Sequence, residues 1–246
     1  MKKLLVLSAL AVMASGAFAK TVIKEERHYV TPIEWGLASP LQLPFTVPYS
    51  AWRVWGVRLD AVLARSLDVY GIDGGLVGLT YGDFAGVQAA AFNWVGDSAY
   101  GIQLGGVGNV AKGPAGGLQL AGFVNYNPEV LAGIQAAGLV NVNGGFYGLQ
   151  VAPANVTTGV GVGLQLGVWN RTDNEFTGGS VGLVNYAENM TGLQIGLINY
   201  AVQTGEGLQL GVFNAAGQFE GLQIGVLNLI NDGEAPYVLP FANARF

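Results

Sequence analysis

Apolar and polar side chains alternate one by one over short runs through most of this chain. The run Gly-Leu-Gln-Ile-Gly at residues 192–196 is typical. Counting from the glutamine as position 0, positions −1, +1 and +3 are mostly Leu, Ile or Val, while −2 and +2 are mostly glycine. A period of two predicts β-strands, since a helix needs a period of 3.6 and tolerates glycine poorly. The pattern therefore predicts an all-β protein.

The same run recurs at intervals of 14 to 16 residues. Glutamine occupies the central position in most copies: Gln88, Gln103, Gln119, Gln135, Gln150, Gln165, Gln194, Gln209 and Gln223. Ser180 fills the one gap, and the same spacing reaches Asp73 and Arg58 toward the N-terminus and Val238 toward the C-terminus. The chain is thus interpreted as twelve tandem repeats and a degenerate thirteenth, with these central residues forming one structural column.

Each repeat is predicted to contain one strand of about ten residues, from −4 to about +5, followed by a turn. An asparagine closes the strand at +5 in most copies and at +6 after Gln103, Gln119 and Gln135. One extra residue within a strand predicts a β-bulge in those three repeats.

Two architectures fit this tandem, and the first is an antiparallel up-and-down β-barrel of 12–14 strands. Ten residues match the length of a tilted strand that crosses a bilayer, and a uniform Leu, Ile and Val face suits lipid. The Gly-Leu-Gln-Ile-Gly core is also nearly palindromic, so antiparallel neighbours can place glutamine beside glutamine. We expect the barrel on these grounds.

The alternative is a parallel β-solenoid, in which each repeat makes one coil. It explains the glutamine and asparagine positions as stacked ladders, and it explains why one strand, not a hairpin, is the repeating unit. Either architecture places Arg58 beside Asp73. The pair is interpreted as structural, at the start of the sheet, with a selectivity pair in a barrel lumen as the other interpretation.

The chain divides into three parts. Residues 1–19 have a positive start, an apolar run and Ala17-Phe18-Ala19, which together predict a signal peptide. Residues 20–52, with a charged stretch that includes His28 and several prolines, predict an extended lead-in that includes a further strand or a plug. Residues 53–246 form a single β repeat domain, and the terminal Phe246 resembles the end of outer-membrane barrel proteins.

Composition argues against catalysis. The chain has no cysteine and one histidine, so the usual nucleophile–base pairs and metal sites are hard to assemble. The carboxylate pairs Asp60 with Asp73 and Asp173 with Glu175 are interpreted as strand-end and turn residues. We expect no enzyme activity, no cofactor and no metal. Charged residues are 11% of the chain and form no basic patch, so a nucleic-acid partner is not expected.

The repeated Gly-Leu-Gln-(Ile/Leu)-Gly-x-x-Asn motif resembles the surface-repeat proteins of spirochaetes such as Leptospira and of other Gram-negative-type bacteria. The segments Val54–Leu59, Val69–Asp73 and Leu239–Phe246 are similar to that family too. The resemblance covers residues 40–246 and implies a cell-envelope location with no known activity.

The expected protein is therefore exported to the outer membrane or cell surface and has outer-membrane lipid as a partner. As a barrel it would have a structural or passive-pore role. As a solenoid it would be an adhesin or scaffold that binds through a glutamine and aromatic face, with Trp94, Trp169, Tyr126, Tyr186 and Tyr200 as surface or corner residues. The sequence names no protein or glycan ligand.

Overall fold

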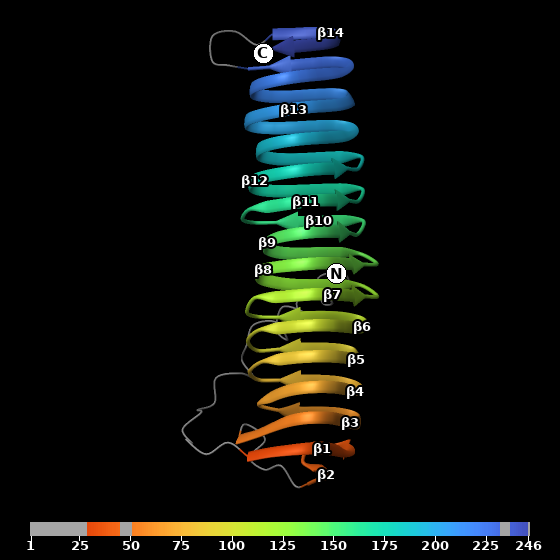
Figure 1. The fold of residues 1–246 in the computed structure, drawn as a ribbon. Helices are drawn as coiled ribbons and strands as arrows, with labels where there is room; N and C mark the ends of the chain where they lie inside the picture. The colour runs from red at the N-terminus through yellow and green to blue at the C-terminus, as the bar shows by residue number, and fades with distance from the viewer. Residues whose placement is uncertain (1–28, 45–50, 232–236, 246) are drawn as a thin grey trace, which may run out of the picture.

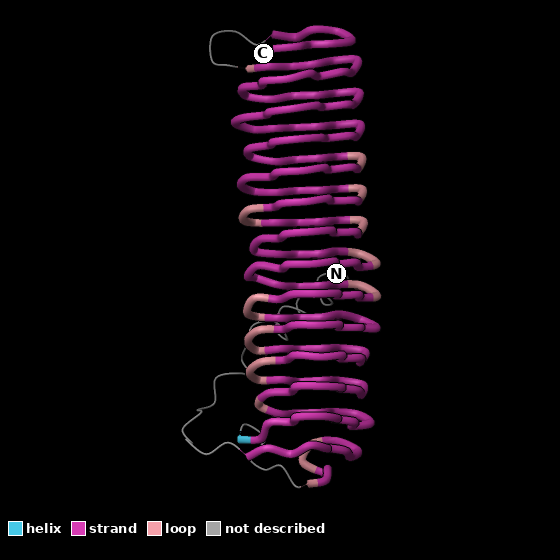
Figure 2. The backbone as a smooth tube through the Cα atoms, in the orientation of Figure 1, coloured by secondary structure: helices cyan, strands magenta, loops and turns pink. Residues whose placement is uncertain are grey.

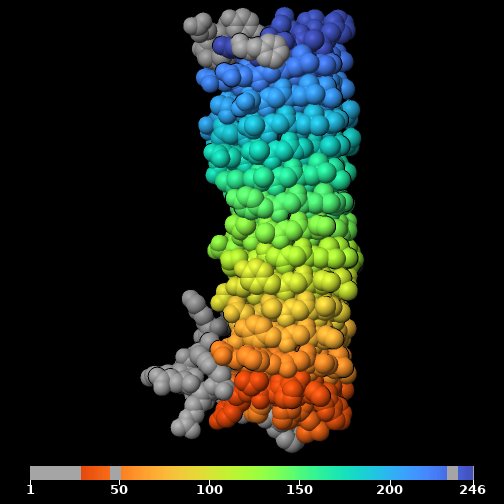
Figure 3. Space-filling model, viewed as in Figure 1, coloured from red at the N-terminus to blue at the C-terminus, as the bar shows by residue number. Residues whose placement is uncertain are grey.

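The computed structural model describes residues 29–44, 51–231 and 237–245. The expected signal peptide and the charged stretch around His28 lie outside these residues. The described chain contains strands and turns but no α-helix, as the period of two predicted. Its coils stack into one uninterrupted column, with the first strand at one end and the last at the other (Figures 1 and 3).

The strands follow one another along the chain with short connections. Their bounds are β1 (Tyr29–Ala38), β2 (Leu41–Leu43), β3 (Trp52–Ser66), β4 (Asp68–Thr80), β5 (Phe84–Val95), β6 (Ala99–Ala111), β7 (Ala115–Ala121), β8 (Val124–Ala137), β9 (Val140–Val151), β10 (Ala154–Thr157), β11 (Gly161–Leu166), β12 (Trp169–Val181), β13 (Val184–Ile230) and β14 (Tyr237–Arg245). The unbroken β13 winds through several coils (Figure 1).

Successive coils pair in parallel, so the barrel expectation is wrong and the solenoid alternative describes the fold. Within β5 and β6, Gln88 lies opposite Gln103, and Gln103 in turn lies opposite Gln119 of β7. The near-palindrome about glutamine is compatible with both strand directions, so it could not decide between them. Parallel stacking is favoured because it brings every residue beside its own equivalent, including the asparagines that a palindrome leaves unmatched.

Each coil contains two extended segments, not the single ten-residue strand expected from the sequence. The chain reverses at both edges of the flattened coil (Figure 2). One reversal, here called the first turn, lies between +2 and the asparagine. The other, the second turn, joins one repeat to the next. The extra residue predicted as a bulge lies at the first turn, where the register shifts between Ala90 and Phe92.

The coil interior is apolar at the end next to the second turn. Residues at −4 and about +7 face each other there and form two clusters of buried side chains. The −4 column includes both large and small residues. Phe146 and Phe176 stack with ring centroids 6.3 Å apart, and Gly161 lies between them. A Cβ on Gly161 would come within 2.6 Å of the Phe146 ring, so this glycine makes room for its aromatic neighbours.

The glycine at −2 is required in every coil. These glycines, here called the glycine column, have φ between 109° and 151°, a conformation that side-chain-bearing residues rarely adopt: Gly56, Gly71, Gly86, Gly101, Gly117, Gly133, Gly148, Gly163, Gly178, Gly192, Gly207 and Gly221. A Cβ there would lie 1.8–2.3 Å from the carbonyl oxygen of the preceding coil. The coils can therefore stack only if this position has no side chain.

Antiparallel strands cover both ends of the column. At the N-terminal end, β1 adds a parallel coil beside β3 and the short β2 folds back on β1. At the C-terminal end, β14 turns back on β13, so the degenerate thirteenth repeat is not a further parallel coil. Asn243, rather than Val238, lies opposite Gln223. Short or reversed terminal strands limit edge-to-edge growth of a parallel stack.

The glycine column makes a direct prediction about stability. Replacing Gly148 by alanine places a Cβ 2.1 Å from the Gly133 carbonyl at φ +135° and should destabilise the fold by roughly 3 kcal/mol or more. Gly106→Ala is the matched control, since its Cβ finds no atom closer than 3.4 Å and its φ is ordinary. Denaturant unfolding followed by circular dichroism measures both. Equal losses in the two variants would contradict the stacking requirement.

Candidate functional site

The column predicted from the sequence lies inside the solenoid. Arg58, Asp73, Ser180 and every glutamine of the column are 0–3% exposed. The expectation of a binding face made of glutamines is therefore wrong, because these side chains cannot reach a ligand. In strand segments the side chains alternate between the two faces, so the polar residues at 0 point inward and the apolar residues at −1 and +1 point outward.

Glutamines in adjacent coils are hydrogen-bonded to one another. The Nε2 of Gln103 donates to the Oε1 of Gln88 at 2.9 Å, and Gln119 donates to Gln103 at 2.6 Å. The ladder continues to Gln165 and resumes from Gln194 to Gln223. Ser180 interrupts it and bonds instead to the Oδ1 of Asn185. The amide of Asn243 extends the ladder to the C-terminal strand by donating to Gln223.

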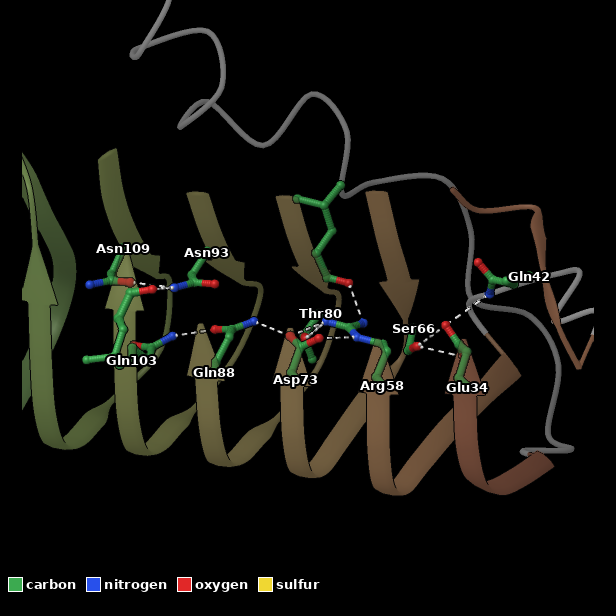
Figure 4. A network of polar contacts seen from close by, with 12 residues as sticks. Glu34, Gln42, Arg58, Ser66, Asp73, Thr80, Gln88, Asn93, Gln103 and Asn109 are labelled. Carbon is green, nitrogen blue, oxygen red and sulfur yellow. Dashed lines mark hydrogen bonds and ion pairs between the residues drawn. The ribbon is translucent and has the colours of Figure 1, made fainter. Parts of the chain in front are cut away.

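A second ladder of buried asparagines lies beside the first turn and is unbroken from Asn93 to Asn228. Each Nδ2 donates to the asparagine of the following coil and to a backbone carbonyl of that coil. Asn109, for example, bonds to Asn125 at 2.9 Å and to the oxygen of Leu120 at 2.8 Å. Glutamines donate toward the N-terminal end and asparagines toward the C-terminal end (Figure 4), so the two rows of amide dipoles oppose each other.

Charged residues replace the amides in the first coils. The guanidinium of Arg58 binds both oxygens of Asp73, at 2.7 and 2.6 Å, and the pair is fully buried. The Nε2 of Gln88 also donates to Asp73, so the ion pair begins the glutamine ladder (Figure 4). Burial alone would lower the pKa of Arg58, but the charge and hydrogen bonds of Asp73 outweigh it and the pKa lies above its ordinary value.

Two further carboxylates are buried near this pair: Glu34, which the sequence did not indicate, and Asp60, which the sequence analysis paired with Asp73 and interpreted as a strand-end residue. Glu34 of β1 lies opposite Arg58 and accepts hydrogen bonds from Gln42 and Ser66. Burial raises the pKa of Glu34 to about 7, although Arg58 opposes the rise. Burial also raises the pKa of Asp60, whose two carboxylate oxygens have no hydrogen-bond partner. The repeat spacing could not have found Glu34, because 14 to 16 residues before Arg58 falls on residues 42–44.

The remaining carboxylate pair lies elsewhere. Asp173 and Glu175 lie at the second turn that β12 passes through, and Asp173 pairs with Arg171. They do not approach Asp60 or Asp73, which lie inside the first coils. In the described part of the chain, no group of three or more His, Cys, Asp or Glu side chains is arranged to hold a metal ion.

The outer surface is apolar along one edge of the column. The first turns expose large hydrophobic side chains in coil after coil, and these define the apolar edge: Val62, Leu76, Val107, Phe123, Leu139, Val168, Trp169, Leu183, Leu197, Ile198, Val212, Phe213, Val226 and Leu227. Each of these is at least 37% exposed. Folded monomers rarely expose a continuous apolar strip of this extent, so the apolar edge is the principal candidate for binding.

The opposite edge, formed by the second turns, is polar. It includes Asp83, Asp97, Lys112, Glu129, Asp173 and Glu188, and is here called the polar edge. Between residues 61 and 231, no charged residue occupies a first turn or the flanking −1 and +1 positions. The solenoid is therefore amphipathic across its width, with the same division in almost every coil.

Aromatic residues lie between the two edges. Tyr100 and Tyr147 are about half exposed at position −3 on one face, while Tyr126, Tyr186 and Tyr200 lie on the other face, just past the asparagines. Trp169 is a first-turn residue and 47% exposed, as expected for a corner aromatic, whereas Trp94 is 5% exposed and is not a surface residue. Lys112 and Arg171 lie 5.4 Å from the rings of Tyr126 and Tyr186.

No protein-family model, curated protein or solved structure matches the chain. Within the described ranges there is no helix that is long and apolar enough to cross a membrane. The fold and the distribution of side chains define the class by themselves. The protein is a parallel β-solenoid that buries ladders of amides and exposes aliphatic and aromatic side chains.

The buried ion pair should behave as a unit. Asp73→Gln removes the carboxylate that is hydrogen-bonded to the buried Arg58 and should cost about 3–5 kcal/mol. The double variant Arg58→Gln/Asp73→Gln extends the glutamine ladder and should recover most of that loss. Denaturant unfolding at pH 5, where Glu34 is neutral, measures both. If the double variant were no more stable than the single one, the ladder would not be interchangeable with the ion pair.

Glu34 should make the N-terminal coils less stable as the pH rises. Below about pH 4.5 its carboxyl is neutral in the folded and unfolded chain, so it contributes nothing. Between pH 4.5 and about 7 the unfolded chain loses the proton first, and stability falls by about 3 kcal/mol, a loss that is complete above pH 7.

The isosteric Glu34→Gln variant tests this effect. It should protect the amides of β1 and β3 from hydrogen exchange at pH 8 more than the wild type, and equally at pH 4.5 after correction for the intrinsic exchange rates. Ser66→Ala, which removes a hydrogen-bond donor to Glu34 without changing its charge, is the control and should retain the pH dependence. A wild-type chain with no difference between the two pH values would contradict the prediction.

Proposed function

We propose that this protein is a non-catalytic scaffold of the bacterial cell envelope, exported to the outer membrane or cell surface, that associates with its surroundings through its apolar edge. The observation that supports the proposal most directly is the reversal of the usual distribution of side chains. The glutamine and asparagine ladders and the carboxylates of Glu34, Asp60 and Asp73 are buried, and one whole edge of the column exposes apolar side chains.

The column is suited to a scaffold for a second reason. Coil upon coil of parallel hydrogen bonds, two amide ladders and covered ends produce a stiff rod whose surface repeats at the spacing of adjacent strands, about 4.8 Å. About twelve coils then give a rod about 58 Å long. The resemblance to surface-repeat proteins and the predicted signal peptide are consistent with export, and both are part of the proposal.

Cell fractionation tests the proposal. In a Gram-negative host the full chain should be recovered with the envelope and remain there after a carbonate wash, which removes peripherally bound proteins. A variant with charges on the apolar edge, Leu197→Glu/Phe213→Glu, should move largely to the soluble fraction. The control variant Thr158→Glu/Gln218→Glu adds the same charges to exposed residues of the polar edge and should stay with the envelope.

Circular dichroism of all three chains excludes misfolding as the reason for release, because each should keep the β spectrum of the wild type. Recovery of the wild-type chain in the soluble fraction, or equal retention of both charged variants, would contradict a scaffold that associates through the apolar edge.

A further inference from the structure

The apolar edge suits a partner that can surround it on several sides. Exposed apolar side chains occur on the first turns and on the −1 and +1 columns of one face, and on the other face Tyr200 is exposed just beyond Asn199. A flat protein surface can cover one of these three sides at a time, whereas hydrocarbon chains surround all of them. A protein interface also has about one hydrogen bond per 100–200 Å², and the side chains of the apolar edge carry no donor or acceptor except the indole of Trp169.

The backbone of the apolar edge meets the main requirement for entering lipid, where every unpaired N–H or C=O is costly. The first turns are hydrogen-bonded from coil to coil. The amide of Phe123 donates to Val107, that of Leu139 to Phe123, and that of Ile198 to Leu183, at 2.9–3.0 Å. The asparagine ladder lies directly behind these turns and donates to the carbonyls at +1, just before the turns.

The aromatic residues indicate how deeply the apolar edge would lie in a lipid leaflet. Tyrosine and tryptophan favour the boundary between hydrocarbon and water, and basic side chains favour the headgroups above it. Five steps of extended chain lead from Tyr100 and Tyr147 at −3 to position +2, where the first turn begins, which is about 16 Å. One leaflet contains about 15 Å of hydrocarbon. With the apolar edge immersed, these two tyrosines lie at the headgroup level. Tyr126 and Tyr186, just past the asparagines on the other face, lie closer to the first turns, and Lys112 and Arg171 lie against their rings.

From these observations we infer that the solenoid lies lengthwise in one leaflet of a lipid bilayer, with the apolar edge among the acyl chains and the polar edge in water. The inference rests on the proposed envelope function and names the partner. The polar edge is mainly acidic and the formal net charge is −5, so attraction to anionic headgroups does not drive the binding. Lipid hydrocarbon is the ligand.

Vesicle binding tests the inference. The purified full chain, kept in mild detergent and then diluted, is mixed with zwitterionic phosphatidylcholine vesicles and separated by flotation. The wild type and Thr158→Glu/Gln218→Glu should float, and 0.5 M salt should leave the bound fraction unchanged, because exposed charges are screened at about that concentration. Leu197→Glu/Phe213→Glu should bind at least about tenfold more weakly, since its carboxylates must enter hydrocarbon.

Depth is measured by tryptophan quenching with brominated lipids. Quenching should be strong in the wild type and should fall in Trp169→Phe, which removes an indole from the apolar edge. Lipids brominated along the acyl chain should quench Trp169 more than lipids labelled at the headgroup. Quenching that is unchanged by Trp169→Phe would overturn the proposed orientation.

Three results would overturn the lipid assignment. They are failure of the wild type to float, flotation only with anionic lipid, and self-association through the apolar edge that vesicles do not reverse, as seen in sedimentation with and without vesicles. If the chain fails to float yet withstands the carbonate wash in cells, the scaffold proposal stands with a protein partner in place of lipid. If it fails both tests, neither proposal survives.

Discussion

The close contact between backbones at the glycine column is the constraint on which the rest of this structure depends. With φ near +130° and the carbonyl of the preceding coil where a Cβ would be, Gly133, Gly148 and Gly163 lock each coil directly onto the next. Coils locked in this way can shift neither along nor across one another. Every residue is therefore held beside its own equivalent, at the separation of adjacent strands.

In-register stacking explains why the interior can be polar. An amide buried alone is destabilising, but an amide that donates to one copy of itself and accepts from the next is satisfied without any other partner. At each end of the stack the last amide lacks one of these two partners. At the N-terminal end Asp73 accepts from Gln88 and is neutralised by Arg58, and at the C-terminal end Asn243 donates to Gln223. The charged cluster is thus a consequence of the ladder and not a separate site.

The repeat length, the column of equivalent positions and the contact between Arg58 and Asp73 could be predicted from the sequence, because identical residues at a constant interval can only reflect a repeated unit. The direction of pairing could not, since Gly-Leu-Gln-Ile-Gly is nearly the same in both directions. The first turn was also missed. Glycine and hydrophobic residues at +2 to +4 continue the strand pattern, and the bend becomes necessary only when the asparagine amide must reach the coil above. Glu34 was not predicted as a buried residue because the lead-in around it lacks the repeated motif.

The same geometry explains why many polar side chains are buried and many apolar side chains are exposed. A flattened coil has a thin interior, and the ladders of glutamine and asparagine occupy most of it, which leaves only the −4 and +7 columns for buried apolar side chains. Hydrogen bonds between coils hold the stack together, so the aliphatic residues at −1, +1 and the first turns are not needed to form a core. Their exposure in water is unfavourable in proportion to their area. An exterior that is apolar in nearly every coil favours contact with another apolar phase, as the proposed lipid partner would supply, and in that arrangement the acidic second turns keep the opposite edge in water.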